Sequence, residues 1–241
     1  MQALILSAGT SSRLGDITKN CHKCLLDIQP GFKILDNQLV SLRNSNINEI
    51  IIVVGYKAKT LIDYVQSNYS DLNVTFVTNK DFSVTNCIYS LWLSREYLND
   101  DLIYLTGDLV MDKNLILEMC KSKNDLILTR NIVNGDNRDF CARISKGLVK
   151  EVSVNLTGNS IFPCLPIMKL SISSVNIWIK KADDMINKGL VNEYEMAALN
   201  GALNIIKLYP YFSDTFCMEV DEKKDLMKLR TESDHSNLGI K

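Results

Sequence analysis

Leu4-Ile-Leu-Ser-Ala-Gly-Thr-Ser-Ser-Arg13-Leu-Gly, near the N-terminus, joins an apolar run to small residues and then to a cation. This order is typical of a buried strand that opens into a loop that a ligand approaches closely. Ala8 and Gly9 have almost no side chain, so the backbone amides can reach an anion, and Gly9 can adopt a positive φ at little cost. The segment therefore predicts a first strand followed by a phosphate-binding loop.

The polar residues of this loop supply the hydrogen-bond donors that a phosphate needs. Thr10, Ser11 and Ser12 add hydroxyl groups, and Arg13 adds a planar guanidinium that suits phosphate oxygens. Lys23 supplies a second cation for the same polyphosphate. Small residues followed by arginine are common at strand ends, however, and neither G-x-G-x-x-G nor G-x-x-x-x-G-K-[ST] occurs in the chain.

Two segments together resemble a known signature. Leu6-Ser-Ala-Gly-Thr-Ser-Ser-Arg13-Leu, followed by Lys23-Cys-Leu-Leu, is similar to L-x-A-G-x-G-S-R-[LM] and P-K-x-L of the nucleotidyltransferases that activate sugar phosphates and phosphocholine. Ser11 stands where the family usually has a second glycine, and His22 stands where it usually has proline. We expect the first change to tighten the nucleotide loop and the second to loosen the φ restraint that would aim Lys23.

Composition is that of an ordinary globular protein. The 241 residues are 46% hydrophobic and 23% charged, and the formal net charge of −1 argues against nucleic acid or an anionic membrane as a partner. No signal peptide and no apolar run of about 18 residues is visible, so we expect a cytoplasmic protein without membrane insertion. Without repeats or linkers, we expect one domain over 1–241, with 232–241 as a loose tail. The oligomeric state is left open.

The cysteines do not indicate a disulfide framework. There are seven, without regular spacing, which favours a reducing compartment. Cys21 and Cys24 form a C-x-x-C that is compatible with a redox centre or half a metal site. Because a second pair is missing and only two histidines occur, we interpret the motif as neither.

Helical and strand patterns alternate along the first half of the chain. Apolar residues have helical spacing within 34–42 and 61–65, and continuous or β-branched runs occupy 49–54 and 73–78. This alternation predicts an α/β fold with a mostly parallel, doubly wound, Rossmann-like sheet and helices on both faces. Ligands of such sheets bind beyond the carboxyl ends of the strands, where the first loop and Gly55-Tyr56 would both lie.

Two aspartates are candidates for holding Mg²⁺. An apolar strand over 102–106 ends in Gly107-Asp108, which presents a carboxylate at the same sheet edge as Gly9, although a simple turn would explain it as well. Asp221 follows a strand over 216–220 and is expected to cap the next helix. The resemblance implies that Asp108 is the family's metal-binding aspartate, and that Asp221, in a segment similar to I-D-T-x-E-D-L, is the second metal carboxylate.

One helix carries a further part of the resemblance. Thr85 or Asn86 would cap it, and Asn86-Cys-Ile-Tyr-Ser-Leu-Trp is similar to N-x-I-Y-S-L-W of phosphocholine cytidylyltransferase-like members, where the asparagine borders the nucleotide pocket. An amphipathic capped helix is the alternative interpretation. Tyr194-Glu195 begins a later helix, where an acid favours the helix dipole in any case. The resemblance implies that this pair meets a cationic acceptor through cation–π and charge interactions.

A hairpin over 140–152, with its turn at Lys146-Gly147, is expected to leave the sheet and help to cover the acceptor site, as the resemblance implies. Family members often have a lysine soon after the second strand, where this chain has Val154-Asn155. Arg143 or Lys150 is the candidate substitute.

The resemblance implies a CTP-dependent cytidylyltransferase with Mg²⁺ as cofactor. The acceptor would be phosphocholine or 2-aminoethylphosphonate; the alternatives are a sugar-1-phosphate nucleotidyltransferase and an inactive nucleotide-binding regulatory module. Arg13 and Lys23 are the expected catalytic residues, and Tyr194, Glu195 and Arg143 the expected acceptor contacts. The expected nucleotide contacts are Leu6, Ala8, Gly9, Thr10, Ser11, Ser12, Gly55, Tyr56, Asn86 and Gly107.

Overall fold

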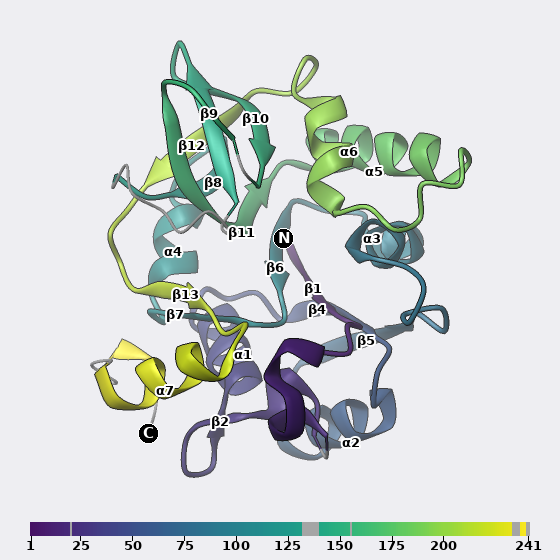
Figure 1. Ribbon diagram of the computed structural model, residues 1–241, viewed down its shortest axis with the longest axis vertical. Coiled ribbons are helices and arrows are strands. Elements are labelled where there is room, and N and C mark those ends of the chain that lie inside the picture. The colour runs from purple at the N-terminus through teal and green to yellow at the C-terminus, as the bar shows by residue number, and fades with distance from the viewer. Residues whose placement is uncertain (20, 132–139, 155, 233–236, 240–241) are drawn as a thin grey trace.

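The structure is a computed structural model that describes residues 1–19, 21–131, 140–154, 156–232 and 237–239 (Figure 1). The main sheet consists of β1 (Gln2–Ser7), β4 (Glu49–Val54), β5 (Asn73–Thr78), β6 (Leu102–Thr106), β8 (Asp125–Thr129), β9 (Cys141–Ser145), β10 (Leu148–Ser153), β11 (Ile161–Leu170) and β12 (Leu208–Phe212). Shorter strands pair as β2 (Asp27–Gln29) with β3 (Phe32–Lys33) and as β7 (Leu109–Met111) with β13 (Cys217–Glu219). The α-helices are α1 (Ile34–Asn44), α2 (Ala58–Asn68), α3 (Cys87–Ser94), α4 (Leu115–Cys120), α5 (Ile172–Ile186), α6 (Glu195–Ala202) and α7 (Lys223–Glu232).

The order of the strands creates a crevice at one edge of the sheet. Strands β5, β4, β1 and β6 lie side by side and are parallel. The chain proceeds from β1 to β4 and β5 on one side and then returns to place β6 on the other side of β1. The loops that follow β1 and β6 therefore diverge, and in open α/β sheets a crevice forms at such a reversal. The predicted phosphate loop and Gly107-Asp108 both lie at this edge.

Helices cover both faces of the sheet, as predicted. Leu4 and Leu6 of β1 face a core that contains residues of α3, α5 and α6. Ala3 and Ile5, one position out of step, face a second core with residues of α1, α2 and α4. Alternate side chains of a strand point to opposite faces, so a strand that is apolar at every position is buried on both sides. Figure 1 shows α3, α5 and α6 grouped on one side of the molecule.

The hairpin β9–β10 is confirmed, including its turn. Lys146 and Gly147 have φ values of 51° and 73°, the left-handed pair that a tight two-residue turn requires. Its neighbour β11 runs antiparallel to β6, β8 and β9 and was not predicted, because Pro163 and Pro166 argue against a central strand. The pairing of β11 with β8 is interrupted between Cys164 and Met168, and Pro166 lies in that gap.

The C-terminal segment corrects one expectation. Leu238, inside the predicted loose tail, is 1% exposed, and its carbonyl accepts a hydrogen bond from Asn37 Nδ2 at 2.8 Å. The Lys113 N–H donates to the Asn237 carbonyl at 2.9 Å. One buried leucine side chain and two hydrogen bonds to backbone carbonyls provide this anchor, and no periodic pattern marks it in the sequence. Residues 233–236 and 240–241 lie outside the described part of the chain. Among the described residues, no helix is both long enough and apolar enough to cross a bilayer.

Candidate active site

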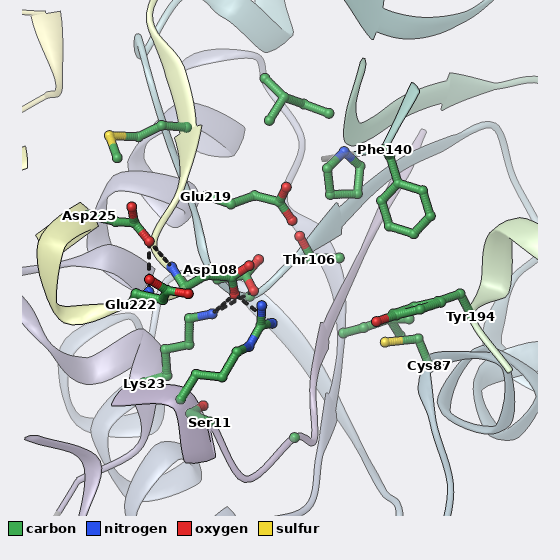
Figure 2. Close-up of a pocket in the computed structure, with 18 of the residues that line it drawn as sticks. Ser11, Lys23, Cys87, Thr106, Asp108, Phe140, Tyr194, Glu219, Glu222 and Asp225 are labelled. Atoms are coloured by element: carbon green, nitrogen blue, oxygen red, sulfur yellow. Dashed lines mark hydrogen bonds and ion pairs between the residues drawn. The ribbon is translucent and has the colours of Figure 1, made fainter. Parts of the chain in front are cut away.

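A cavity of about 520 Å³ lies at the carboxyl ends of β1 and β6. Figure 2 shows that it has two differently built ends. Lys23, Asp108, Glu222 and Asp225 lie at one end, and Cys87, Phe140 and Tyr194 lie at the other. Of the predicted site residues, those that line the cavity are Leu6, Gly9, Ser11, Arg13, Lys23, Asn86, Gly107, Asp108, Tyr194, Glu195 and Asp221.

The first loop is divided between two surfaces. Gly9, Ser11 and Arg13 face the cavity, whereas Thr10 and Ser12 line an adjacent depression of about 260 Å³, together with Tyr56. Ala8 lines neither; it is buried, and its carbonyl accepts a hydrogen bond from the Tyr56 N–H at 3.0 Å. The structure therefore brings only part of the predicted nucleotide set to the main cavity. Side chains on successive loop residues point in different directions, which a linear motif does not reveal.

Two glycines are required by close packing beneath the loop. A Cβ at Gly107 would lie 1.9 Å from Ser7 Oγ, and a Cβ at Gly55 would lie 2.6 Å from the Ala8 carbonyl oxygen. Both distances are far below van der Waals contact. Gly107 lines the cavity, but Gly55 does not. Because Gly55 has no side chain, the loop that follows β4 can pack closely against the loop that follows β1.

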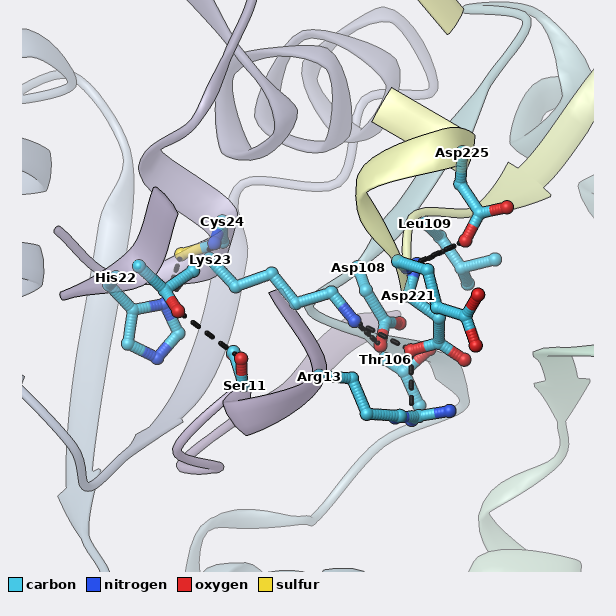
Figure 3. A network of polar contacts seen from close by, with 12 residues as sticks. Ser11, Arg13, His22, Lys23, Cys24, Thr106, Asp108, Leu109, Asp221 and Asp225 are labelled. Carbon is cyan, nitrogen blue, oxygen red and sulfur yellow. Dashed lines mark hydrogen bonds and ion pairs between the residues drawn. The ribbon is translucent and has the colours of Figure 1, made fainter. Parts of the chain in front are cut away.

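At the polar end, the predicted cations contact the predicted metal carboxylates. Lys23 Nζ lies 2.8 Å from both Asp108 Oδ2 and Asp221 Oδ1, and an Arg13 guanidinium nitrogen lies 3.0 Å from the same Asp221 oxygen (Figure 3). Burial opposes the charge of Lys23, but the two carboxylates outweigh it and raise the pKa of the ammonium. Burial likewise opposes the charge of Asp108, and the nearby Lys23 ammonium holds the pKa of that carboxyl below its usual value.

The pair of strands β7 and β13 brings the two aspartates together. Leu109 pairs with Glu219, and the Val220 N–H donates to the Asp108 carbonyl at 3.0 Å. Asp221 was expected to cap α7, and the structure corrects this. The Asp225 carboxylate accepts from the N–H groups of Asp221 and Glu222 at 3.0 and 2.7 Å, so the first turn of the helix provides its own cap. The Asp221 carboxylate is thereby left to contact Arg13 and Lys23.

The donor set fits a magnesium ion that is shared with phosphates. Asp108 Oδ1 is buried and has no hydrogen-bond partner among the described residues, so a hard oxygen ligand is available beside Asp221. In the described part of the chain, no group of three or more Asp, Glu, His or Cys side chains is arranged to hold a metal. Phosphate and water oxygens would therefore have to complete the coordination of an ion held here. Cys21 and Cys24 are both free thiols.

The other end of the cavity combines aromatic rings with a buried acid. Tyr194 is 47% exposed and packs edge to face on Phe140, with ring centroids 5.3 Å apart. Glu195 is 1% exposed, and its Oε1 accepts a hydrogen bond from the Tyr104 hydroxyl at 2.6 Å. Burial raises the pKa of this carboxyl. The Oε2 atom is buried and has no hydrogen-bond partner among the described residues.

Asn86 has two roles in the structure. It caps α3, because its side-chain oxygen accepts from the Cys87 N–H at 2.8 Å, and it also lines the cavity. The predicted cap and the predicted proximity to the site are therefore both present in one residue.

The predicted acceptor contact Arg143 is not brought to the cavity. Its guanidinium pairs with Glu151 Oε2 across the hairpin at 3.0 Å and donates to the Thr157 carbonyl at 3.3 Å. Lys150 is exposed on β10 and does not line the cavity either. Val154 does line it, and Asn155 lies outside the described residues. Side chains of a hairpin alternate between its faces, so a position near the site in sequence can point away from it.

Several cavity residues were not predicted. Glu219 and Glu222 flank Asp221, and their closeness in sequence was the signal available for them. Arg130 follows β8 and donates to the carbonyls of residues 213, 215 and 217 at 2.6 to 2.7 Å. These partners are remote in sequence, so no local pattern predicts the contacts. Strand β11 pairs with β9, and residues of β11 line the cavity together with Phe140, which directly precedes β9.

Comparison with known proteins agrees with this geometry. The sequence model of the family described as Nucleotidyl transferase matches residues 2–135, more than half of the chain. A choline-phosphate cytidylyltransferase of Haemophilus influenzae is 38% identical over 117 residues, which are 48% of this chain and 48% of that protein. A CMP-5'-(3-aminopropyl)phosphonate synthase of Streptomyces rubellomurinus is 32% identical over 112 residues, 46% of this chain and 18% of that protein. The matches thus span half or less of these curated relatives.

The fold has a solved counterpart. The structure of CTP:phosphocholine cytidylyltransferase from Streptococcus pneumoniae superimposes with a TM-score of 0.79, covers 95% of this chain and 97% of that one, and is 22% identical in sequence. At this level of identity, the likeness establishes the architecture alone. The expected α/β, mostly parallel, Rossmann-like fold is confirmed.

Proposed function

The chain belongs to the nucleotidyl transferase family, and from this premise we propose that it is a CTP-dependent cytidylyltransferase that activates a small phosphorylated amine or aminoalkylphosphonate. A phosphate or phosphonate oxygen of the acceptor attacks the α-phosphorus of CTP. The new P–O bond forms as the bond to the bridging oxygen of the β-phosphate breaks, and pyrophosphate leaves. No covalent enzyme intermediate is needed.

The observation that carries the proposal is the meeting of Arg13, Lys23, Asp108 and Asp221 at one end of the cavity. Arg13 would bind the β- and γ-phosphates, and Lys23 would contact the α-phosphate and the incoming oxygen. Both cations would then exchange their carboxylate partners for phosphate oxygens. A Mg²⁺ ion held by Asp108 and Asp221 would neutralise charge on the triphosphate. Catalysis would come from positioning and from charge stabilisation.

The acceptor end supports an amine-bearing substrate. The exposed ring of Tyr194 and the buried Glu195 carboxylate offer a π face and a negative charge to an ammonium group. The similar proteins include a choline-phosphate cytidylyltransferase and a CMP-5'-(3-aminopropyl)phosphonate synthase, whose names indicate substrates of this kind. Phosphocholine and 2-aminoethylphosphonate both combine an anion with a cation, and both fit the proposal.

The test is pyrophosphate release by the purified protein with Mg²⁺. Each of the four ribonucleoside triphosphates is offered with phosphocholine, 2-aminoethylphosphonate or glucose-1-phosphate. Release with CTP and an amine-bearing acceptor is expected. Release with glucose-1-phosphate alone would assign the protein to the sugar-1-phosphate nucleotidyltransferases. Nucleotide binding without turnover of any acceptor would favour an inactive nucleotide-binding module and contradict the proposal.

A further inference from the structure

The residue before Lys23 takes no part in the proposed chemistry, yet it is almost fully buried at the site. His22 is 3% exposed and stands at the start of the 3₁₀ turn Lys23–Leu25. We propose that His22 is a positioning residue, whose ring caps this turn and thereby holds the Lys23 ammonium at the phosphates. The inference rests on the proposed function, because it assumes that Lys23 contacts the nucleotide.

The ring of His22 accepts a hydrogen bond from the backbone of the turn. Its Nδ1 atom accepts from the Cys24 N–H at 3.2 Å and lies 3.0 Å from Cys24 Sγ (Figure 3). The bond to the backbone is that of an N-cap side chain, which satisfies an N–H left free by the first turn. The His22 carbonyl accepts from the Leu25 N–H at 2.9 Å as well. His22 therefore holds the turn through both its side chain and its backbone.

The protonation state of the ring suits this role. Nδ1 must keep its lone pair to accept, so the neutral ring carries its proton on Nε2. Burial, with a smaller contribution from the Lys23 ammonium, lowers the pKa of His22 to about 4. Burial also raises the pKa of the Cys24 thiol, which therefore remains a potential S–H donor. The cap is thus intact at neutral pH.

The backbone of His22 has the conformation that proline would impose. Its φ and ψ are −71° and 145°, and proline fixes φ near −65°. Proline is the residue that the family signature has at this position. The sequence predicts a looser φ restraint without proline; in the structure His22 nevertheless adopts this φ, and its hydrogen bonds supply a restraint of their own. Proline would restrain the backbone before Lys23 through its ring, whereas His22 restrains it through hydrogen bonds.

The backbone at Lys23 must be held in place because the side chain is long, and a small backbone shift would move the ammonium. Its Nζ makes two contacts of 2.8 Å while the side chain is 9% exposed. A shift of the turn would displace the ammonium from both carboxylates and, in the complex, from the α-phosphate. Misplacement of a reacting group by about 1 Å can cost on the order of 100-fold in rate.

The test compares two substitutions that separate capping from packing. His22→Leu retains apolar volume but has no acceptor, and His22→Asn has an acceptor but leaves more empty space. We expect kcat to fall about 10-fold or more in His22→Leu and to stay within about 3-fold of wild type in His22→Asn, while the Asn variant has the lower Tm. His22→Pro should also retain kcat, because it restores the φ restraint. The KM for the acceptor should be unchanged in all three.

The control is Cys24→Ala, which removes the thiol but keeps the N–H that His22 caps, and kcat should remain close to wild type. Equal kcat in His22→Leu and wild type would overturn the proposal. So would losses that follow Tm instead of the presence of a cap or a proline. Wild-type protein without turnover would count against the proposed function alone. The dissociation constant for CTP would then decide about His22: several-fold weaker binding in His22→Leu, but not in His22→Asn, would support its positioning role, and equal binding would overturn it.

Discussion

At the scale of single residues, Lys23 is central to the site, since its ammonium bridges Asp108 and Asp221 while the side chain is nearly buried. Lys23→Ala should lower the rate of pyrophosphate release by about 10²–10³-fold, the cost of losing one preorganised donor. It should also strengthen Mn²⁺ binding in the absence of nucleotide, because the carboxylates no longer contact an ammonium. Titration calorimetry measures the second effect.

Lys59→Ala is the control for this experiment. The Lys59 side chain is 85% exposed and pairs with Asp63, and neither residue lines the cavity. Its removal should leave both rate and Mn²⁺ affinity unchanged. A Lys23→Ala protein with wild-type turnover would contradict the assigned role.

Ser11 is the second residue that invites a test, because its φ of 56° and ψ of 36° lie in the left-handed region. This conformation is costly for residues other than glycine, which the family signature usually has here. Ser11→Gly should therefore be neutral or stabilising by up to about 1 kcal/mol. Ser12→Gly, in the adjoining 3₁₀ turn, should destabilise by roughly 0.5–1 kcal/mol. Urea denaturation compares the two, and the same sign of change for both would contradict this account.

At the scale of secondary-structure elements, the site depends on the segment between β12 and β13. The guanidinium of Arg130 donates to two carbonyls of this segment, at residues 213 and 215, and to the carbonyl of residue 217 in β13. The segment continues into β13, which pairs with β7 and leads to Asp221. Arg130 therefore supports the strand that brings the two aspartates together.

Arg130→Met should lower the free energy of unfolding by roughly 1–3 kcal/mol, since three carbonyls lose a charged donor. The dissociation constant for Mn²⁺ in the presence of CTP should rise, because Asp221 is held less firmly relative to Asp108. Lys180→Met, on the exposed face of α5, is the control and should change neither quantity. Loss of stability with unchanged Mn²⁺ affinity would show that the segment does not control the position of Asp221.

At the scale of the whole molecule, we expect the ionisation of Glu195 to contribute to the pH dependence of the free energy of unfolding. Burial raises its pKa in the folded state, so Glu195 releases its proton at a higher pH in the folded protein than in the unfolded chain. Folding is therefore less stable as the pH rises through the folded-state pKa, because ionisation places a charge at a buried position. Glu195→Gln removes this titration. Below the ordinary pKa of glutamate, the two proteins should respond to pH alike; at pH 8 the variant should have gained stability relative to wild type.

The measurement is urea denaturation of both proteins between pH 4 and pH 8. The difference between their free energies of unfolding should increase with pH across the range in which Glu195 ionises. Parallel curves would contradict the raised pKa. Tyr104→Phe is the companion variant, because it removes the one hydroxyl that donates to Glu195 Oε1 and should steepen the loss of stability with rising pH.

Local patterns in the sequence were sufficient for much of the fold. Apolar runs closed by glycine identified β1, β4 and β6, and helical spacing identified α1 and α2, because burial on two faces or on one produces a regular pattern of apolar residues. The candidate phosphate loop, Lys23, Asp108 and Asp221 were identified from the residue types at strand ends and from the resemblance that their order carries. These features depend on residues that are close in sequence.

Tertiary structure decided the rest. The strand β11 carries prolines that local rules exclude, and it forms because β6, β8 and β9 offer partners on both sides. The direction of Arg143, the cap provided by Asp225 and the burial of Leu238 likewise depend on neighbours that are remote in sequence or on the face that a side chain takes. By itself the sequence determined which groups are available for chemistry and at which strand ends they stand. Only the folded chain decided which of them meet, because contacts between distant segments depend on the register of the whole sheet.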